Sequence, residues 1–507
     1  MNNAPHHGQH VDVAVIGSGF GGLGCALRLA ERGASVALYE ALNYPGGCAS
    51  TFTRHRCRFE SGATLFSGFG EGQLMRRWID DHAMPVQMHF IDPPVVLRTP
   101  DFTLEIPNDR AAFVDRLCAM PGAPEQALRR FFTDQGRIAD TLWSLFSDPA
   151  LLPPFGPGGF MAHLRRSPRY LPLLRVIGRP LGAVMARYGV ADFDPLRITL
   201  DALCQITVQA GVQAAEAPFA MATMDYTFRG TGHVEGGVGV LARAITDTLT
   251  DLGAQVRMPD RVHCITREGD RWRVKSRKGE LTAQVVVANM LPQDVRALAG
   301  IEQGSHRTLD RLSERVEEGW GAVMLYRVVE PDAPVRPEAH HIEIVQDPAA
   351  PFIHGNHLFC SVSDVAEDRA PEGRRTVTVS THVRLAELLA MSADDQRVHV
   401  ESIQQHMRDG LDRFAPELSG EAVHREMPAS PRTFERFTRR HGGYVGGIPR
   451  RAGLINYTGL FPKPVQPGLY MVGDTMFPGQ STLATALGGY KLAEHLMKKG
   501  VGSRALT

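Results

Sequence analysis

Three glycines and one carboxylate near the start of the chain have the types and spacing to bind a dinucleotide. Gly17, Gly19 and Gly22 follow the apolar run 11–16 with G-x-G-x-x-G spacing, and Glu40 lies 23 residues after Gly17. The first glycine permits a tight turn, the second lets a pyrophosphate approach the backbone, and the third lets a helix pack on a strand. A carboxylate at the distance of Glu40 accepts hydrogen bonds from a ribose diol and repels a 2′-phosphate. The pattern therefore predicts a dinucleotide site that disfavours NADP.

The elements around these residues form a complete βαβ unit. The residues before Gly17 are apolar and predict a buried strand, and Leu23, Ala26, Leu27 and Ala30 recur at helical period. A second strand is predicted over 35–39 and ends at the acid. A helix N-terminus that follows such a turn offers unpaired N–H groups and a positive dipole end to phosphates.

A second strand–loop–helix segment lies at the other end of the chain. A strand is predicted over 468–472, a loop over 473–480, and a helix over 481–499 with Ser481 as its N-cap. A helix N-terminus suits the N1–C2=O edge of a reduced flavin, where negative charge develops. Asp474 is placed to accept a hydrogen bond from a ribityl hydroxyl. The alternative is a capped terminal helix without a ligand.

Several stretches together resemble the phytoene desaturase-like flavoproteins, the superfamily of carotenoid desaturases, prolycopene isomerases and retinol saturases. The stretches that carry this resemblance are 13–22, 45–52, 235–241, 430–438, 442–449 and 473–480. They span both ends and the middle of the chain. The resemblance implies FAD as the cofactor, with its pyrophosphate at Gly17, Gly19 and Gly22, its adenosine ribose at Glu40, and its adenine against the backbone of Val262.

The same resemblance assigns the flavin half of the cofactor. Gly46 and Gly47 would lie near the ribityl chain. The ribityl–isoalloxazine end would be held by the C-terminal loop, through Gly473, Asp474, Gly479 and Gln480.

The activity that the resemblance implies is FAD-dependent oxidation of C–C and C=C bonds in a long apolar polyene. Desaturation of this kind transfers a hydride to flavin N5 and releases a proton, and the protein must position the carbons and exclude water. The polar groups considered for that face are Glu60, His233, Arg439 and His441, and each also has a purely structural interpretation. Three other functions remain open: a redox-neutral cis–trans isomerase, a flavin amine oxidase, and a non-catalytic prenyl-binding chaperone of the same fold.

The charge balance and the cysteine content limit the kinds of partner and site that the chain can have. Lys+Arg and Asp+Glu both total 55, so no overall positive field favours nucleic acid. The seven cysteines contain no C-x-x-C pair, which argues against a disulfide framework and a zinc site and suits a reducing compartment. We expect a cytoplasmic protein without a metal. One dinucleotide unit is evident, so electrons are expected to leave to oxygen or a quinone.

One segment favours contact with a membrane surface. Residues 149–191 contain no Asp or Glu but six arginines among apolar residues. Arginine with apolar neighbours suits docking on anionic lipid, where a polyene would dissolve. An amphipathic lid over a pocket and a partner-binding surface are the alternatives.

The order of these patterns predicts an α/β protein in which a Rossmann-like FAD-binding domain is interleaved with an α+β substrate-binding domain. Nucleotide-type segments recur at the start, middle and end of the chain, which assigns 1–75, 230–300 and 455–507 to the first domain. The second domain would comprise 76–229 and 301–454.

Overall fold

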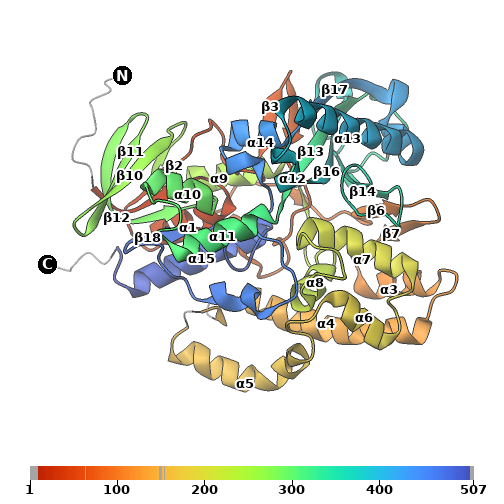
Figure 1. The fold of residues 1–507 in the computed structure, drawn as a ribbon, viewed down its shortest axis with the longest axis horizontal. Helices are drawn as coiled ribbons and strands as arrows, with labels where there is room; N and C mark the ends of the chain where they lie inside the picture. Colours follow the sequence, from red (N-terminus) through yellow and green to blue (C-terminus); the bar gives the residue numbers. More distant parts are fainter. Residues whose placement is uncertain (1–9, 63, 148–150, 154, 503–507) are drawn as a thin grey trace.

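Two seven-stranded sheets organise the part of the chain that the structure describes (Figure 1). The structure is a computed structural model that describes residues 10–502 except 63, 148–150 and 154. The first sheet draws its strands from distant parts of the sequence. In sheet order these are β10 (Val262–Glu268), β11 (Arg271–Ser276), β12 (Gly279–Ala288), β1 (His10–Ile16), β2 (Val36–Tyr39) and β9 (Gln255–Arg257), with β18 (Leu469–Met471) beside β12.

Strand β1 lies at the centre of this sheet, parallel to β12 and β2. Its side chains alternate between two cores: Val13 and Val15 belong to one and Ala14 and Ile16 to the other. A strand buried on both faces is typical of a parallel sheet covered by helices. The helices associated with this sheet and its connections are α1 (Phe20–Glu31), α2 (Leu74–Asp81), α9 (Val238–Asp251), α10 (Pro292–Ala299), α11 (Arg307–Glu317) and α15 (Thr482–Lys498).

Helices α1 and α15 bring the two ends of the chain together. A Cβ atom added at Gly24 would lie 2.5 Å from the Ala486 carbonyl oxygen, and one at Gly489 would lie 2.0 Å from the Gly21 oxygen. These glycines let the two backbones approach closely. As a result, the loops before α1 and before α15 open at the same edge of the sheet.

The second sheet is built from another set of strands and has its own helices. In sheet order its strands are β17 (Val423–Ala429), β13 (Trp320–Val329), β16 (Arg375–Arg384), β15 (His357–Val362), β14 (His340–Val345), β6 (Val95–Arg98) and β7 (Thr103–Ile106). In β13, Val323 and Leu325 pack into the core beneath α13, whereas Met324 and Tyr326 belong to the opposite face. The remaining helices on this side are α12 (Leu385–Leu389), α13 (Ala393–Phe414) and α14 (Pro431–Thr438).

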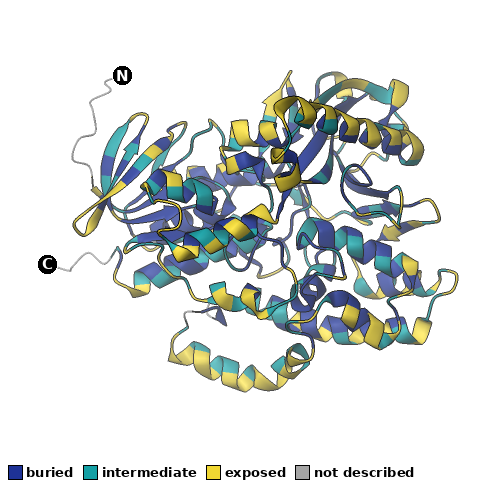
Figure 2. Cartoon of the chain, viewed as in Figure 1, coloured by how far each residue is buried: buried dark blue, intermediate teal, exposed yellow. Residues whose placement is uncertain are grey.

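A group of helices lies beside the second sheet, in the lower part of Figure 1, with α5 at the bottom. These helices are α3 (Arg110–Cys118), α4 (Glu125–Ser147), α5 (Pro157–Leu174), α6 (Leu181–Tyr188), α7 (Asp194–Thr207) and α8 (Ala217–Met224). Most of them share one hydrophobic core, but α5 contributes no buried residue and forms an outlying arm (Figure 2). Two small antiparallel pairs, β3 (Thr51–Arg54) with β4 (Cys57–Glu60) and β5 (Met88–His89) with β8 (His233–Val234), complete the strands.

Short 3-10 turns join several of these elements. They are η2 (Pro371–Gly373), η3 (Pro416–Leu418), η4 (Gly420–Ala422), η5 (His441–Gly443) and η6 (Leu454–Leu460).

The α/β class predicted from the sequence is confirmed. The N-terminal βαβ unit is present, and the predicted C-terminal helix begins at Thr482 with Ser481 as its N-cap, whose hydroxyl accepts a hydrogen bond from Ala484 N at 3.0 Å. Strand β12 begins at Gly279, where it pairs antiparallel with β11. Among the described helices, none is long and apolar enough to span a bilayer.

Candidate active site

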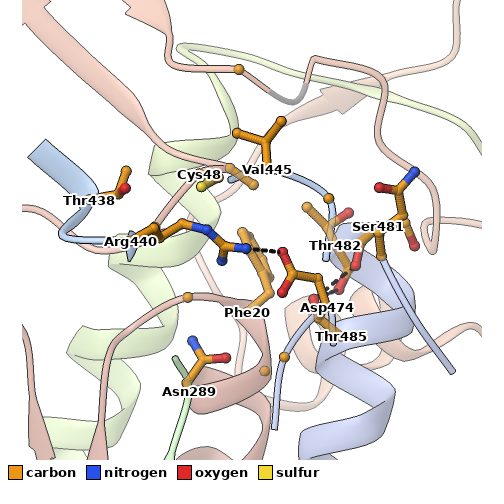
Figure 3. Close-up of a pocket in the computed structure, with 18 of the residues that line it drawn as sticks. Phe20, Cys48, Asn289, Thr438, Arg440, Val445, Asp474, Ser481, Thr482 and Thr485 are labelled. Atoms are coloured by element: carbon orange, nitrogen blue, oxygen red, sulfur yellow. Dashed lines mark hydrogen bonds and ion pairs between the residues drawn. The ribbon is translucent and has the colours of Figure 1, made fainter. Parts of the chain in front are cut away.

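A cavity of about 580 Å³ runs from the first sheet to the second. One end reaches Tyr39, Glu40 and Val262, at the carboxyl end of β2 and the start of β10. The middle lies between the turn before α1 and the loop before α15, and the far end is closed by strands β13, β15 and β16 and helices α4, α7 and α8. Figure 3 shows its middle part, with Arg440 directed at Asp474.

The turn before α1 leaves room for a ligand close to the backbone. Gly17 has φ +97°, and a Cβ atom at Gly19 would lie 2.6 Å from Asn289 Nδ2. A Cβ at Gly22 would lie 2.0 Å from the Gly17 carbonyl oxygen. The N-cap residue of α1 is itself Gly19, so no side chain caps the first N–H groups of the helix. These groups remain available to a pyrophosphate.

Glu40 anchors this turn from the end of β2. Its Oε2 accepts hydrogen bonds from Ser18 N at 2.9 Å and Ser18 Oγ at 2.6 Å, and its Oε1 accepts from Leu42 N at 2.9 Å. Oε1 accepts only one of these bonds and has a second lone pair, so the group still has acceptor capacity toward the cavity that it lines. Val262 lines the same end.

Two further glycines, Gly46 and Gly47, lie against the turn before α1. Gly46 has φ +112° and donates its N–H to Ser18 O at 2.9 Å, while Gly47 has φ +64°. A Cβ at Gly47 would lie 3.3 Å from the Gly19 Cα. Both glycines line the cavity, so this loop and the turn before α1 form one continuous backbone surface.

The loop before α15 carries a partly buried ion pair. Arg440 Nη2 lies 2.8 Å from Asp474 Oδ2, and Arg440 Nε donates to the Tyr444 carbonyl at 2.6 Å (Figure 3). Burial alone would lower the pKa of Arg440, but the neighbouring carboxylates of Asp474 and Asp294 raise it, so its charge is secure. The pair fixes the Asp474 carboxylate at the wall of the cavity.

The first turn of α15 points into the cavity. Gly473 and Gly479 have φ +112° and +132°, and Ser481 has φ +100°. The conformation of Ser481 is costly for a residue with a side chain, at about 1–3 kcal/mol, and such strain concentrates at functional sites. Ser481 and Thr482 line the cavity, so the positive end of the helix dipole faces it.

Unpartnered polar atoms line the cavity at both ends. Five buried atoms of the lining have no hydrogen-bond partner among the described residues: Tyr39 Oη, Ser67 Oγ, Gln209 Oε1, Arg450 Nε and Thr482 Oγ1. A buried polar atom without a partner is costly, which indicates that a polar ligand completes these bonds. Together with the glycine-lined turns, they fit an elongated dinucleotide such as FAD.

The far end of the cavity is largely apolar. Its wall comes from the second sheet and from three helices, and includes Trp143, Phe146, Phe219, Met324 and Phe359. A flat or elongated hydrocarbon suits such a lining better than a charged substrate does.

Glu60 and His233 lie in a separate buried network and do not line the cavity. Glu60 is 3.4 Å from Arg369 and accepts from Thr51 Oγ1 at 3.0 Å, and His233 bonds to Glu367. Burial raises the pKa of Glu60 despite these partners. This network joins the β3–β4 hairpin to the start of α9, which is a structural role.

The other two predicted polar groups also stand away from the apolar end. Arg439 reaches the edge of the cavity but is exposed. His441 is exposed and is absent from the lining, and its backbone N–H bonds to Asp294 at 3.1 Å. The next residue along from Arg439, Arg440, is the one that enters the site.

Comparisons with known proteins match this geometry. A family model described as an NAD(P)-binding Rossmann-like domain matches residues 15–81. A prolycopene isomerase of an Oncidium hybrid is 26% identical over 508 residues, covering 96% of this chain and 84% of that protein. A hydroxyneurosporene desaturase of Cereibacter sphaeroides is 25% identical, covering 96% and 97%. These relatives fit the carotenoid desaturase superfamily, which the sequence motifs also resemble.

A solved structure shares the fold of this desaturase-like chain. An oxidoreductase from Methanosarcina mazei superposes with a TM-score of 0.64 at 17% identity, covering 95% of this chain and all of that one. The sequence relatives confirm the resemblance inferred from the motifs. The chain is an enzyme, an oxidoreductase with FAD as its cofactor.

Proposed function

We propose that this enzyme desaturates a long apolar polyene of the isoprenoid type. The observation that carries the proposal is one continuous cavity with a polar, glycine-lined half and an apolar half. Relatives over nearly the whole chain are named as prolycopene isomerases and a hydroxyneurosporene desaturase, which supports a carotenoid-like substrate.

We further propose how the chain holds the cofactor. Gly17, Gly19 and Gly22 would face the pyrophosphate and Glu40 the adenosine ribose, with Val262 beside the adenine. Their positions along one end of the cavity support this orientation.

The flavin half of FAD would then lie in the C-terminal half of the site. Gly46 and Gly47 would lie near the ribityl chain. Asp474, which Arg440 holds in place, would accept from a ribityl hydroxyl, and the segment Gly473–Gln480 would meet the isoalloxazine ring.

Bound FAD supplies a two-electron acceptor for C–H bonds. In a desaturation two neighbouring C–H bonds break and one C=C bond forms, so a hydride and a proton leave the substrate, which together are two electrons and two protons. The chain contributes a dry wall that excludes water and positions the two carbons. The described lining shows no carboxylate at the apolar end, where an extended conjugated system can spread developing positive charge without a strong protein base. We propose oxygen or a quinone as the final electron acceptor.

A redox-neutral isomerase is the second candidate, because two relatives that align with 96% of this chain carry that name. The same cavity would hold the substrate while reduced FAD assists a cis–trans change.

Anaerobic spectroscopy of the purified enzyme tests both functions. A desaturase should bleach its flavin absorbance once when a carotenoid-like substrate is added without oxygen. An isomerase should leave the absorbance of the dithionite-reduced protein unchanged and convert substrate repeatedly. A colourless protein that takes up no added FAD would overturn both.

We also propose the domain division 1–75, 230–300 and 455–507 against 76–229 and 301–454. The strands of the first sheet all come from the first set, and those of the second sheet all come from the second set, which supports it.

We propose that α5 contacts an anionic membrane surface from the cytoplasmic side. Of the segment 149–191, residues 149, 150 and 154 lie outside the described residues. Exposed apolar side chains form one stripe on α5, at 46% to 68% exposure: Phe160, Met161, Leu164, Leu171 and Leu174. Arg165 and Arg169 of the same helix are also exposed. The seven free cysteines agree with a reducing compartment.

The position of α5 suits a substrate entrance. Trp143 and Phe146 line the cavity from the last turns of α4, and α4 packs against α5. A polyene dissolved in the bilayer would therefore meet the apolar end of the cavity near the docking helix.

A further inference from the structure

Arg450 is a buried cation that the described residues leave incompletely paired. Its side chain lines the cavity, and the residue is 6% exposed. Nη2 donates to the Met476 carbonyl at 3.1 Å, and the guanidinium lies 5.6 Å from the centre of the Phe219 ring. Nε has no hydrogen-bond partner among the described residues.

Such a charge is expensive without an anionic partner. Burial lowers the pKa of Arg450 to about 10, and nearby Arg315 adds to this effect, while Asp474 opposes it. An arginine remains protonated at neutral pH even so. A buried ion that lacks a counter-charge is costly unless a ligand supplies one.

The position of Arg450 indicates which part of a ligand it meets. A Cβ atom at Gly479 would lie 3.0 Å from both Nε and Nη2 of Arg450, so the guanidinium lies against this glycine. Gly479 is two residues before Ser481, the N-cap of α15. The positive end of the helix dipole and the guanidinium therefore act on the same part of the cavity.

The pyrophosphate of FAD is not a suitable partner for this charge. In the proposed orientation it lies at the turn before α1, which already supplies free N–H groups from the helix. The other part of FAD that becomes anionic is the pyrimidine edge of the isoalloxazine, N1–C2=O, when the flavin is reduced.

We propose that Arg450, together with the N-terminus of α15, contacts the pyrimidine edge of the isoalloxazine and stabilises the negative charge of its reduced form. This inference rests on FAD lying in the cavity as proposed above. The contact raises the reduction potential of the cofactor, because it stabilises the reduced form more than the neutral oxidised form. Uptake of electrons from a hydrocarbon, which offers no charge of its own, is favoured accordingly.

Holoenzyme variants test the contact by a property other than turnover. We expect Arg450→Met to lower the equilibrium constant for two-electron reduction of bound FAD at least tenfold, which corresponds to about 30 mV in midpoint potential. Arg450→Lys keeps the charge and should recover most of the shift. The neighbouring Arg451 is exposed and pairs with Glu318 at 2.9 Å, so Arg451→Met is a matched control and should leave the potential unchanged.

A second measurement uses the wild-type holoenzyme and does not depend on a variant folding. If the reduced flavin is held as an anion, its midpoint potential should change by about 30 mV per pH unit at mildly acidic pH, one proton for two electrons. A change of about 60 mV per pH unit would show a neutral reduced flavin and would overturn the proposal.

The outcomes separate this inference from the proposed function. An FAD-loaded Arg450→Met protein with an unchanged potential overturns the role of Arg450 alone. If the potentials are as expected but the enzyme oxidises no polyene, the role of Arg450 is supported and the proposed substrate is overturned. A chain that binds no FAD overturns both.

Discussion

The turn before α1 can form only because Gly22 has no side chain. At Gly22 the space for a side chain is already filled by the Gly17 carbonyl, 2.0 Å from where a Cβ would stand. A backbone oxygen cannot move aside as the end of a flexible side chain does. The helix and the turn approach each other this closely because neither carries a side chain at the contact.

The substitution Gly22→Ala should therefore damage both the fold and the cofactor site. We expect a loss of about 3 kcal/mol in the free energy of unfolding, the upper end for overpacking, because the turn must shift. FAD content should fall with it, since the turn also bears the N–H groups proposed for the pyrophosphate. Thermal denaturation and the flavin-to-protein absorbance ratio measure the two effects.

Gly158→Ala is the matched control for this substitution. Gly158 lies in α5, and a Cβ there would meet nothing within 4 Å. Thermal stability and FAD content should stay at the wild-type level. Full FAD content in the Gly22→Ala protein would contradict the role given to this turn.

Strand β14 shows how a buried polar residue ties elements together. His341 is 4% exposed, with Nδ1 3.0 Å from the Pro94 carbonyl and Nε2 3.1 Å from the Thr64 carbonyl. A neutral imidazole donates from only one nitrogen, so one of these carbonyls is satisfied at a time. Burial lowers the pKa of His341 from 6.5 to about 4.

This shift predicts a loss of stability in acid. Above pH 6.5 the imidazole is neutral in both the folded and the unfolded chain, so its contribution is fully present. As the pH falls from 6.5 to about 4, the unfolded chain binds the proton first and the folded state loses stability, by roughly 3 kcal/mol for this residue. Chemical denaturation across that pH range measures the loss.

His341→Gln should remove this part of the acid sensitivity. The variant is expected to lose less stability than the wild type over the same range, whereas His89→Gln, at an exposed position, should behave as the wild type does. Identical pH dependence in all three proteins would refute the assignment to His341.

At the scale of an element, the exposed apolar side chains of α5 lead to a prediction about membrane binding. The double substitution Leu171→Ser and Leu174→Ser removes two exposed apolar side chains, each worth about 1.5 kcal/mol when buried in lipid. Binding to vesicles that contain anionic lipid should weaken about 100-fold in a sedimentation assay. Val398→Ser on α13, also exposed, is the control and should bind normally. Unchanged binding of the α5 variant would exclude it as the docking element.

At the scale of the whole molecule, the cavity joins two separately built cores. Its lining draws on the first sheet, the second sheet and the helices α4, α7 and α8. A ligand that contacts all three parts binds the folded arrangement and not the unfolded chain, so it stabilises the molecule as a unit.

Removal of FAD should therefore lower the stability of the entire enzyme. At a free cofactor concentration 100 times the dissociation constant, bound FAD contributes about 2.7 kcal/mol. We expect the apoprotein to unfold at a lower temperature, and the temperature to recover as FAD is added back. Calorimetry with and without added FAD measures this change in unfolding temperature, and free riboflavin is the control ligand. A melting temperature that does not respond to FAD would contradict the bridging position.

Local spacing in the sequence determined the N-terminal βαβ unit, the capped C-terminal helix and the class of cofactor. Each of these depends on residues within one turn or one strand, such as the glycines before α1 and Ser481 before α15. Residue spacing along the chain predicts short-range geometry directly. Spacing does not single out Arg440 or Arg450, and the sequence pattern favours Arg439 and His441 instead. Only the tertiary structure decides which of these arginines is turned into the site, because that depends on Asp474 and Gly479, which meet Arg440 and Arg450 from another segment. The same holds for Glu60 and His233: their partners Arg369 and Glu367 are more than a hundred residues away.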